Sequence, residues 1–146
     1  MNALHDLQTL LSQHKDERVI VLGGTCTGKS TFVEQIENAQ DMDALLFPLL
    51  TEDETTFVCQ TPWTEKIGET MVALVTERIA VVPGKPVFGT VVLNADIIIH
   101  LKISDELLSN RTASRGVLIE DAKNMQRHLE KQIANSKIPV IEFSVG

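Results

Sequence analysis

The sequence predicts an α/β fold: a five-stranded parallel sheet with helices on both faces, in a three-layer α/β/α arrangement. Two observations support this class. Segments typical of buried strands alternate along the chain with segments whose apolar residues recur at helical spacing. The first strand-like segment also leads directly into a glycine-rich turn that opens a helix, at residues 23–31. Because right-handed connections between parallel strands carry helices, this alternation favours one sheet that is covered on both sides.

The first third of the chain predicts a helix, a strand and a second helix. Residues 2–14 carry leucines on one face, and residues 18–23 have the apolar run of a buried strand. A helix is expected to follow the glycine-rich turn, up to about residue 38. Residues 39–54 are ambiguous, because Pro48 interrupts their apolar stretch.

The middle of the chain predicts two strands separated by a helix. Residues 55–60 are rich in Thr, Phe and Val, which favour a second strand. Residues 64–77 place apolar side chains at helical spacing. Residues 78–82 then predict a third strand, which ends at Pro83-Gly84.

The last third predicts the fourth and fifth strands with helices between them. Residues 95–102 contain three consecutive isoleucines, as expected for a strand buried on both faces. Ser104 is placed to cap the next helix, because two acidic residues follow it in the first turn. Residues 118–133 carry an apolar helical stripe, and residues 139–143 predict the fifth strand.

Length and charge limit the possible partners. The 146 residues are 43% apolar and 23% charged, which predicts a single domain over residues 1–146 with one packed core. The net charge of −7 argues against nucleic acid, whose phosphates need clustered Lys and Arg. We find no apolar run of membrane-spanning length and no signal pattern, and the two cysteines suit a reducing compartment. We therefore expect a cytoplasmic protein without membrane or nucleic-acid partners, of undetermined oligomeric state.

The glycine-rich turn fits a phosphate-binding pattern. Its sequence G-G-T-C-T-G-K-S, residues 23–30, matches G-x-x-x-x-G-K-[ST] at every fixed position. Glycine at these positions lets backbone N–H groups approach a phosphate closely, at a helix start that also favours an anion. The lysine then supplies positive charge to the β- and γ-phosphates, and the serine hydroxyl is placed for Mg²⁺. The expected nucleotide-binding residues are Gly23, Gly24, Thr25, Cys26, Thr27, Gly28, Lys29, Ser30 and Thr31, with Ser30 on the metal of Mg-ATP.

Ligands of such sheets bind beyond the carboxyl ends of the strands. The residues that follow the other predicted strands are therefore expected to face the same crevice as the phosphate loop (residues 23–30). These residues are Gln60, Thr61, Trp63, Pro83, Gly84, Lys85 and residues 102–105.

A second segment carries a resemblance to a known family. The apolar strand of residues 95–101 is followed by L-L-S-N-R-T-A-S-R-G, which places Arg111 and Arg115 one helical turn apart. Together with the phosphate loop, this series resembles the P-loop small-molecule kinases, the group that contains adenylate, shikimate and nucleoside kinases. The resemblance implies the P-loop NTPase fold and a short lid around residues 110–117, with Gly116 as a hinge or helix terminator.

The same resemblance implies a catalytic role for the two arginines beside Lys29. Guanidinium groups match phosphate oxygens, and phosphoryl transfer is catalysed mostly by positioning and electrostatic stabilisation. The alternative is a solvated helix face with two cations near its C-terminus.

The chain departs from the family pattern at a carboxylate. Related kinases carry an Asp at the end of the third strand, whereas residues 79–82 run into Pro83-Gly84 without one. Asp96 precedes the fourth strand, at the wrong end for the crevice, so we expect a structural role. Candidates to replace the missing group are residues 52–54 and the pair Asp41 and Asp43, with solvated loop residues as the alternative.

The acceptor pocket is the least determined part. Trp63 is expected either to stack on a flat acceptor or to pack in the core, and Lys85 is a candidate contact for an anionic acceptor. His100 and His128 show no partners in the sequence pattern and are expected to be structural or solvated.

These features predict an enzyme, an ATP-dependent phosphotransferase that moves the γ-phosphate of Mg-ATP to a small hydroxyl- or phosphate-bearing acceptor, such as a nucleoside or nucleotide. Lys29, Arg111 and Arg115 are its expected catalytic residues. The alternative is a nucleotide-binding regulatory or interaction module without transfer activity, which the missing strand-end carboxylate favours. A GTPase is disfavoured, because the chain has no Asn-Lys-x-Asp or Asp-x-x-Gly motif.

Overall fold

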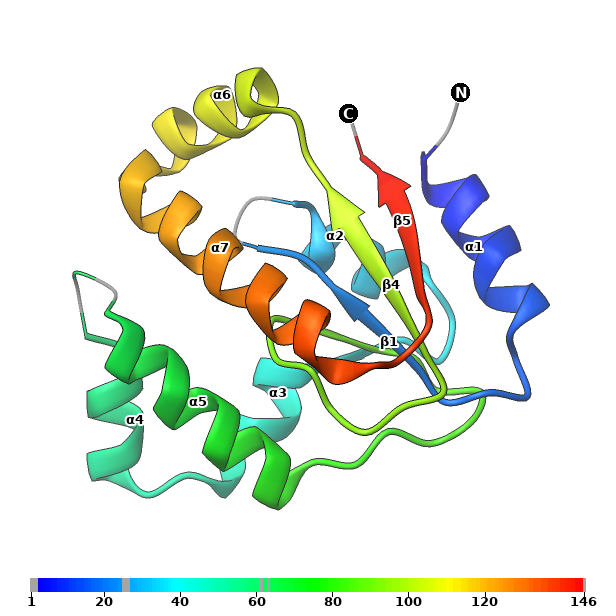
Figure 1. Cartoon of the computed structure of the whole chain (residues 1–146), viewed down its shortest axis with the longest axis horizontal. Coiled ribbons are helices and arrows are strands. Elements are labelled where there is room, and N and C mark those ends of the chain that lie inside the picture. Colours follow the sequence, from blue (N-terminus) through cyan, green and yellow to red (C-terminus); the bar gives the residue numbers. More distant parts are fainter. Residues whose placement is uncertain (1–2, 25–26, 61, 63, 146) are drawn as a thin grey trace.

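The protein, seen here as a computed structural model that describes residues 3–24, 27–60, 62 and 64–145, is built on a five-stranded sheet. The sheet order is β2-β3-β1-β4-β5, and every pairing is parallel. The strands are β1 (Val19–Leu22), β2 (Gln40–Asp41), β3 (Val87–Gly89), β4 (Ile97–Lys102) and β5 (Val140–Ser144). The predicted α/β class with a five-stranded parallel sheet is therefore confirmed (Figure 1).

Helices cover both faces of this sheet. In Figure 1, α7 lies in front of the sheet and α2 lies behind it. The helices are α1 (Ala3–Gln13), α2 (Lys29–Gln35), α3 (Met42–Leu46), α4 (Glu52–Val58), α5 (Glu65–Arg78), α6 (Asp105–Arg115) and α7 (Ile119–Ser136), with a 3-10 turn at Phe47–Leu49.

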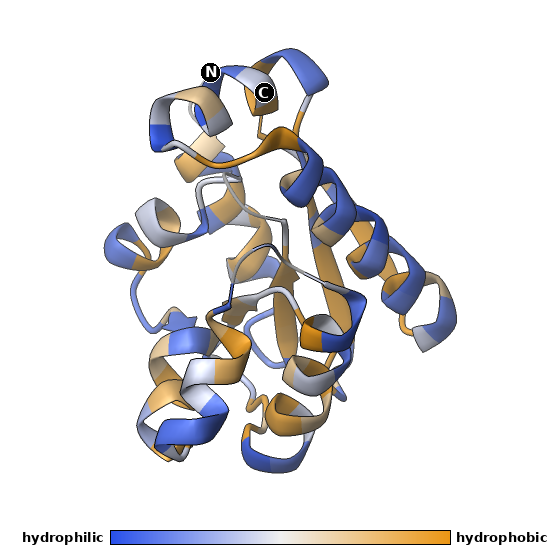
Figure 2. Ribbon diagram, turned by 90° about the vertical axis from the view of Figure 1, so that its left-hand side faces the viewer, coloured by the Kyte–Doolittle hydropathy of each residue, from blue (hydrophilic) through white to orange (hydrophobic). Residues whose placement is uncertain are grey.

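The core has two halves because successive side chains of a strand point to opposite faces. On one face, Val21 of β1 packs in a cluster with Leu7 of α1 and Phe32 of α2. On the other face, Ile20 packs in a cluster that includes Leu129 of α7 and side chains of α3 and α5. Figure 2 shows the apolar strands enclosed by helices with long hydrophilic stretches. Among the described residues, none of the helices combines the length and the apolar character of a membrane span.

Several sequence predictions at helix ends are confirmed. The Ser104 hydroxyl accepts a hydrogen bond from the Leu107 N–H at 3.2 Å and caps α6. Gly116 ends that helix in the left-handed conformation, with a φ of 68°, which glycine adopts at little cost. The apolar stripe of α7 begins later than expected, because Leu118 precedes the helix and is 66% exposed.

Asp96 has the structural role that was expected. Its carboxylate accepts hydrogen bonds from the Arg18 backbone N–H at 2.8 Å and from the Arg18 guanidinium at 3.0 Å. These bonds join the chain just before β4 to the chain just before β1. Both residues lie at the amino edge of the sheet, away from the phosphate loop.

The predicted second strand at residues 55–60 is wrong, because this segment belongs largely to α4. The Thr51 hydroxyl accepts from the Glu54 N–H at 3.2 Å, and the Glu54 carboxylate accepts from the Thr51 N–H at 2.8 Å. This reciprocal capping box, with acidic residues in the first turn, outweighs the strand preference of Thr, Phe and Val. The true second strand is β2, inside the segment that the sequence left ambiguous.

The predicted third strand at residues 78–82 is also wrong. Arg78 ends α5, and a turn follows in which the Lys85 N–H donates to the Val82 carbonyl at 3.3 Å. Gly84 has a φ of 78° in this turn, as the Pro83-Gly84 pair suggests. The strand comes after the turn rather than before it: β3 pairs with β1, with Phe88 beside Val21.

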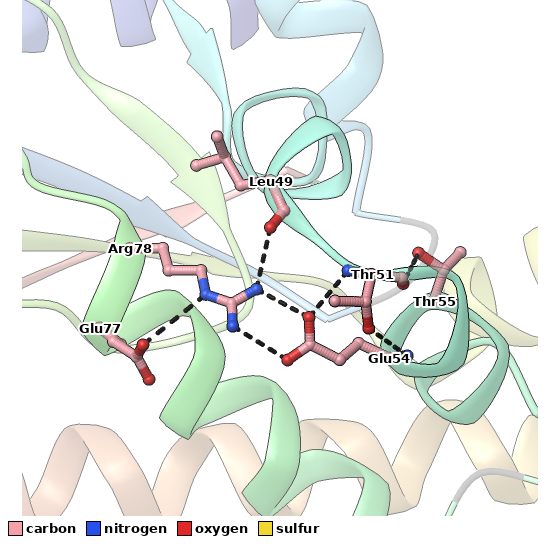
Figure 3. A network of polar contacts seen from close by, with 6 residues as sticks. All are labelled: Leu49, Thr51, Glu54, Thr55, Glu77 and Arg78. Carbon is pink, nitrogen blue, oxygen red and sulfur yellow. Dashed lines mark hydrogen bonds and ion pairs between the residues drawn. The ribbon is translucent and has the colours of Figure 1, made fainter.

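Glu54 also joins α4 to α5 (Figure 3). Arg78 donates to both carboxylate oxygens of Glu54, at 2.8 and 2.9 Å, and to the Leu49 carbonyl at 2.9 Å. The hydrogen bonds from Arg78, followed by that from the Thr51 backbone, lower the pKa of Glu54 to about 2. Glu54 is therefore a structural ion-pair partner, neither a solvated loop residue nor a replacement for the missing carboxylate.

Candidate functional site

The phosphate loop leaves the sheet between β3 and β4, which flank β1 on either side. Gly23 donates its N–H to the Gly89 carbonyl at 3.2 Å. A Cβ on Gly23 would lie 2.6 Å from Thr27 Oγ1, so no side chain fits there. Gly28 has a φ of 92°, a left-handed conformation that disfavours other residues. Both fixed glycines of the motif thus have a conformational reason to be glycine.

Lys29 lies at the start of α2, directly after the loop. Its Nζ donates to the carbonyl oxygens of Gly23 at 2.6 Å and Gly24 at 2.7 Å. The Thr27 hydroxyl is buried and donates to the same Gly24 carbonyl at 2.8 Å. The ammonium group is therefore held across the loop. Thr25 and Cys26, two of the expected binding residues, lie outside the described residues.

One cavity, of about 320 Å³, lies between the loop and helices α3, α5 and α7, and we call it the α5–α7 cavity. The loop contributes residues 27–30 to its lining. The remaining lining residues are Asp43, Phe47, Val58, Ile67, Gly68, Met71, Thr90, Val91, Arg115, Met125, His128 and Gln132.

A second cavity, of about 500 Å³, lies between the loop and α6, and we call it the α6 cavity. Thr27, Gly28 and Arg115 line both cavities. The other residues of the α6 cavity are Ala3, Thr31, Phe32, Asn110, Arg111, Ser114 and Val145. The loop is thus the common wall of two cavities.

The two arginines of α6 both lie beside the loop. One guanidinium nitrogen of Arg111 is 3.7 Å from the place that a Cβ on Gly28 would take. Arg111 is half-buried and borders the α6 cavity, whereas Arg115 is exposed and borders both cavities. Arg111 and Arg115 lie 83 and 87 positions after Gly28, so they are difficult to assign to the same site without the fold. Their one-turn spacing is the signal that suggested it.

A carboxylate does reach the site, and it comes from the first turn of α3, directly after β2. Asp41 caps α3 through a hydrogen bond that its Oδ1 accepts from the Asp43 N–H at 3.0 Å. Asp43 lines the α5–α7 cavity together with loop residues 27–30. Partial burial raises the pKa of Asp43, the Asp41 charge raises it further, and the positive charge of Lys29 acts against both. Asp43 thus lies in a helix rather than in a loop, but its side chain is exposed, as the solvated alternative had it.

Other sequence expectations fail for the same topological reason. Gly84 lies before β3 and lines a separate pocket with Val19, at the amino edge of the sheet. Pro83-Gly84 and Lys85 are thus at the wrong end to face the loop. Gln60 is exposed and residues 102–105 border neither cavity, while Thr61 and Trp63 lie outside the described residues.

The two histidines differ. His100 is buried in β4, and burial is the main cause that lowers its pKa, so the expected structural role is confirmed. His128 instead lines the α5–α7 cavity, as does Gln132 one turn further along α7. The sequence offered one signal for His128 and Gln132, because they are spaced four residues apart beside the apolar stripe of α7.

Comparison with known proteins leaves the family open. No protein-family model matches the chain, and no curated protein sequence matches it. The structure is similar to that of a gluconokinase from Sinorhizobium meliloti 1021, with 17% sequence identity, a TM-score of 0.49, and coverage of 91% of this chain and 85% of that chain. A likeness this distant transfers no activity, so the functional argument rests on the site itself.

Proposed function

We propose that this protein is a P-loop small-molecule kinase, which transfers the γ-phosphate of Mg-ATP to a small hydroxyl- or phosphate-bearing acceptor. The observation that carries this proposal is the position of the phosphate loop between two cavities that share Thr27, Gly28 and Arg115. Phosphoryl transfer needs donor and acceptor on opposite sides of the migrating group. A module that only binds a nucleotide needs one cavity.

The α6 cavity would hold the nucleoside end of ATP. Its volume of about 500 Å³ lies within the range of small-molecule sites. Arg111 approaches the loop from this side and would contact phosphate oxygens or the base. Lys29 Nζ, now bonded to loop carbonyls, would exchange these for phosphate oxygens of the bound nucleotide.

The oxygen donors of the site fit Mg²⁺ that arrives with the nucleotide. Ser30 lines the α5–α7 cavity, and its hydroxyl group is the expected protein ligand. Over the described part of the chain, no group of three or more His, Cys, Asp or Glu side chains could hold a metal by itself. This suits Mg²⁺, which takes many of its oxygen ligands from phosphates and water. When bound, the ion would neutralise charge on the β- and γ-phosphates.

The acceptor would occupy the α5–α7 cavity with its hydroxyl group toward the loop. The acceptor oxygen forms a bond to the γ-phosphorus, and the bond from that phosphorus to the bridging oxygen breaks, with the electron pair leaving on ADP. Asp43 takes the hydroxyl proton, and its raised pKa makes it a stronger base than an ordinary Asp. Arg115 borders both cavities and would stabilise the charge of the migrating group, opposite Lys29.

The proposal is tested by measuring ADP and phosphorylated product from Mg-ATP and a panel of nucleosides, nucleoside monophosphates, sugars and sugar acids. We expect acceptor-dependent turnover that falls by at least about 100-fold in Lys29→Met. Calorimetry with ATP measures nucleotide binding independently of turnover. Nucleotide binding without acceptor-dependent ADP release would reject the kinase and favour a binding module.

A further inference from the structure

The wall of the α5–α7 cavity beyond the loop is largely apolar. Its side chains come from the 3-10 turn, α4, α5, the segment after β3 and α7, and all of them are buried or half-buried. The apolar side chains are Phe47, Val58, Ile67, Met71, Val91 and Met125, and the polar ones are Thr90, His128 and Gln132. A ligand that fills this part of the cavity must therefore present an apolar body, because polar atoms without partners are costly to bury there.

The permanent charges of this lining lie at its loop end. Lys29 belongs to the loop motif, and Arg115 also borders the α6 cavity on the other side of the loop. Asp43, the carboxylate of the lining, shares the loop end with them through its electrostatic interaction with Lys29. A second anionic group on the acceptor would thus enter a wall without Lys or Arg, with a like charge nearby. That arrangement disfavours phosphorylated or carboxylate-bearing acceptors.

Gln132 adds a directional group to the apolar wall. Its Oε1 accepts a hydrogen bond from the Val92 N–H at 3.3 Å, and this fixes which end of the amide is the oxygen. The amide nitrogen Nε2 is buried and has no hydrogen-bond partner among the residues that the structure describes. Buried donors without a partner are rare in native proteins, so a donor of this kind on a cavity wall suits a ligand atom that accepts a hydrogen bond.

We propose that the α5–α7 cavity selects an uncharged hydroxyl compound with an apolar body, and that Gln132 donates a hydrogen bond to a carbonyl oxygen or ring nitrogen of that compound. This rests on the proposed kinase function, which it makes more specific. Neutral nucleosides are uncharged hydroxyl compounds, and the flat faces of their bases can pack against apolar side chains while a ring carbonyl or nitrogen accepts the hydrogen bond. Nucleoside monophosphates and sugar acids carry the anionic group that the wall does not match. Gln132 is thus a specificity-determining residue rather than a catalytic one.

The test compares uridine with uridine 5′-monophosphate, which differ by one phosphate, and includes gluconate as an anion without an apolar body. Binding is measured by calorimetry without ATP, and turnover is measured separately with Mg-ATP. We expect uridine to bind, and to be phosphorylated with a kcat/KM at least about tenfold above those of the two anions. Equal or better binding of either anion would overturn the inference, whatever the turnover.

Variants of Gln132 test the proposed hydrogen bond. Gln132→Glu keeps an oxygen for the Val92 N–H and removes the donor, and Gln132→Met removes both groups at similar length. We expect each to weaken uridine binding and raise its KM about tenfold, with the KM for ATP unchanged. Asn135→Asp is the control, because it adds the same charge at an exposed position of the same helix. The inference fails if Gln132→Glu behaves like Asn135→Asp.

The two proposals fail in different ways. Uridine binding that depends on Gln132, without any ADP release, would reject the kinase function and leave the selectivity of the cavity intact. ADP release with anionic acceptors alone would leave the kinase function intact and reject the selectivity.

Discussion

At the scale of single residues, the site brings together charged side chains from three separate elements. Lys29 comes from the start of α2, Asp43 from α3 and Arg115 from α6. The charges act on one another: burial and Asp41 raise the pKa of Asp43, and Lys29 opposes that rise. A carboxylate held this way is a useful proton acceptor, because its basicity exceeds that of a solvated Asp.

Asp43→Asn tests this role. The substitution keeps the size of the side chain and removes the proton acceptor, so we expect kcat to fall about 100-fold or more while the KM for ATP changes little. Because the pKa of Asp43 is raised, kcat of the unaltered protein should decline on acidification at a higher pH than an ordinary Asp would give. A pH profile of kcat that is identical in both proteins would exclude Asp43 as the base.

The two arginines should separate kinetically, because they border different cavities. Arg111 lines the α6 cavity and not the α5–α7 cavity. Arg111→Met is therefore expected to raise the KM for ATP about tenfold with little change in kcat. Arg115 borders both cavities, so Arg115→Met should lower kcat by roughly 100-fold. Steady-state kinetics of both variants decide the matter; equal effects on the same parameter would argue for a merely solvated helix face.

At the scale of elements, α4 and α5 are joined by the bidentate pair of Glu54 and Arg78. The same Glu54 closes the capping box of α4, so one carboxylate both starts a helix and fixes its neighbour. Ile67 and Met71 of α5 and Val58 of α4 line the α5–α7 cavity. The pair therefore supports a wall of the site without touching the loop.

This pair predicts a pH dependence of stability. The pKa of Glu54 is lowered from 4.5 to about 2, so its contribution is fully present above pH 4.5 and is lost as the pH falls to about 2. Glu54→Gln should lower the Tm at neutral pH and flatten the acid decline of the Tm in this window. Thermal melts from neutral pH down to about pH 2 measure both effects.

Glu77→Gln is the matched control for Glu54→Gln. Glu77 lies 3.9 Å from the same guanidinium, but its side chain is 70% exposed. Exposed ion pairs contribute little to stability, so the melts of Glu77→Gln should follow those of the unaltered protein. If Glu77→Gln shifted the Tm as much as Glu54→Gln, net charge rather than the half-buried Glu54–Arg78 pair would be the cause.

At the scale of the whole molecule, the strand order explains why one loop serves two cavities. β1 has β3 on one side and β4 on the other. The chain after β1 therefore emerges beside the point at which the strand order reverses. Crevices form at such points, because the connections on the two sides turn to opposite faces. Here α6 closes one side, while α3, α5 and α7 close the other.

A ligand that binds at this junction should stabilise the entire fold. A non-hydrolysable ATP analogue with Mg²⁺ at 100 times its Kd would add about 2.7 kcal/mol to the free energy of unfolding, and would raise the Tm by several degrees. Lys29→Met should abolish most of that rise while leaving the Tm of the free protein near its original value. Differential scanning calorimetry measures both quantities, and an unchanged rise in Lys29→Met would place the nucleotide elsewhere.

Features that depend on neighbours in the chain were predictable. The phosphate loop, the caps at Ser104 and Gly116, and the alternation of helix and strand follow from spacing and local conformation. The errors at residues 55–60 and 78–82 arose where strand preference competed with a capping box and a tight turn. β2 was invisible because it has only two residues, and pairing with β3 rather than its own pattern makes it a strand.

The sequence by itself thus determined the sheet class and the phosphate loop, because both are written in short-range periodicity and contiguous residues. Tertiary structure alone decided that Asp43 and Gln132 line one cavity with the loop, and that Arg115 borders both cavities. These side chains come from helices far apart in the chain, which meet only because the strand order carries α3, α6 and α7 to the same edge of the sheet.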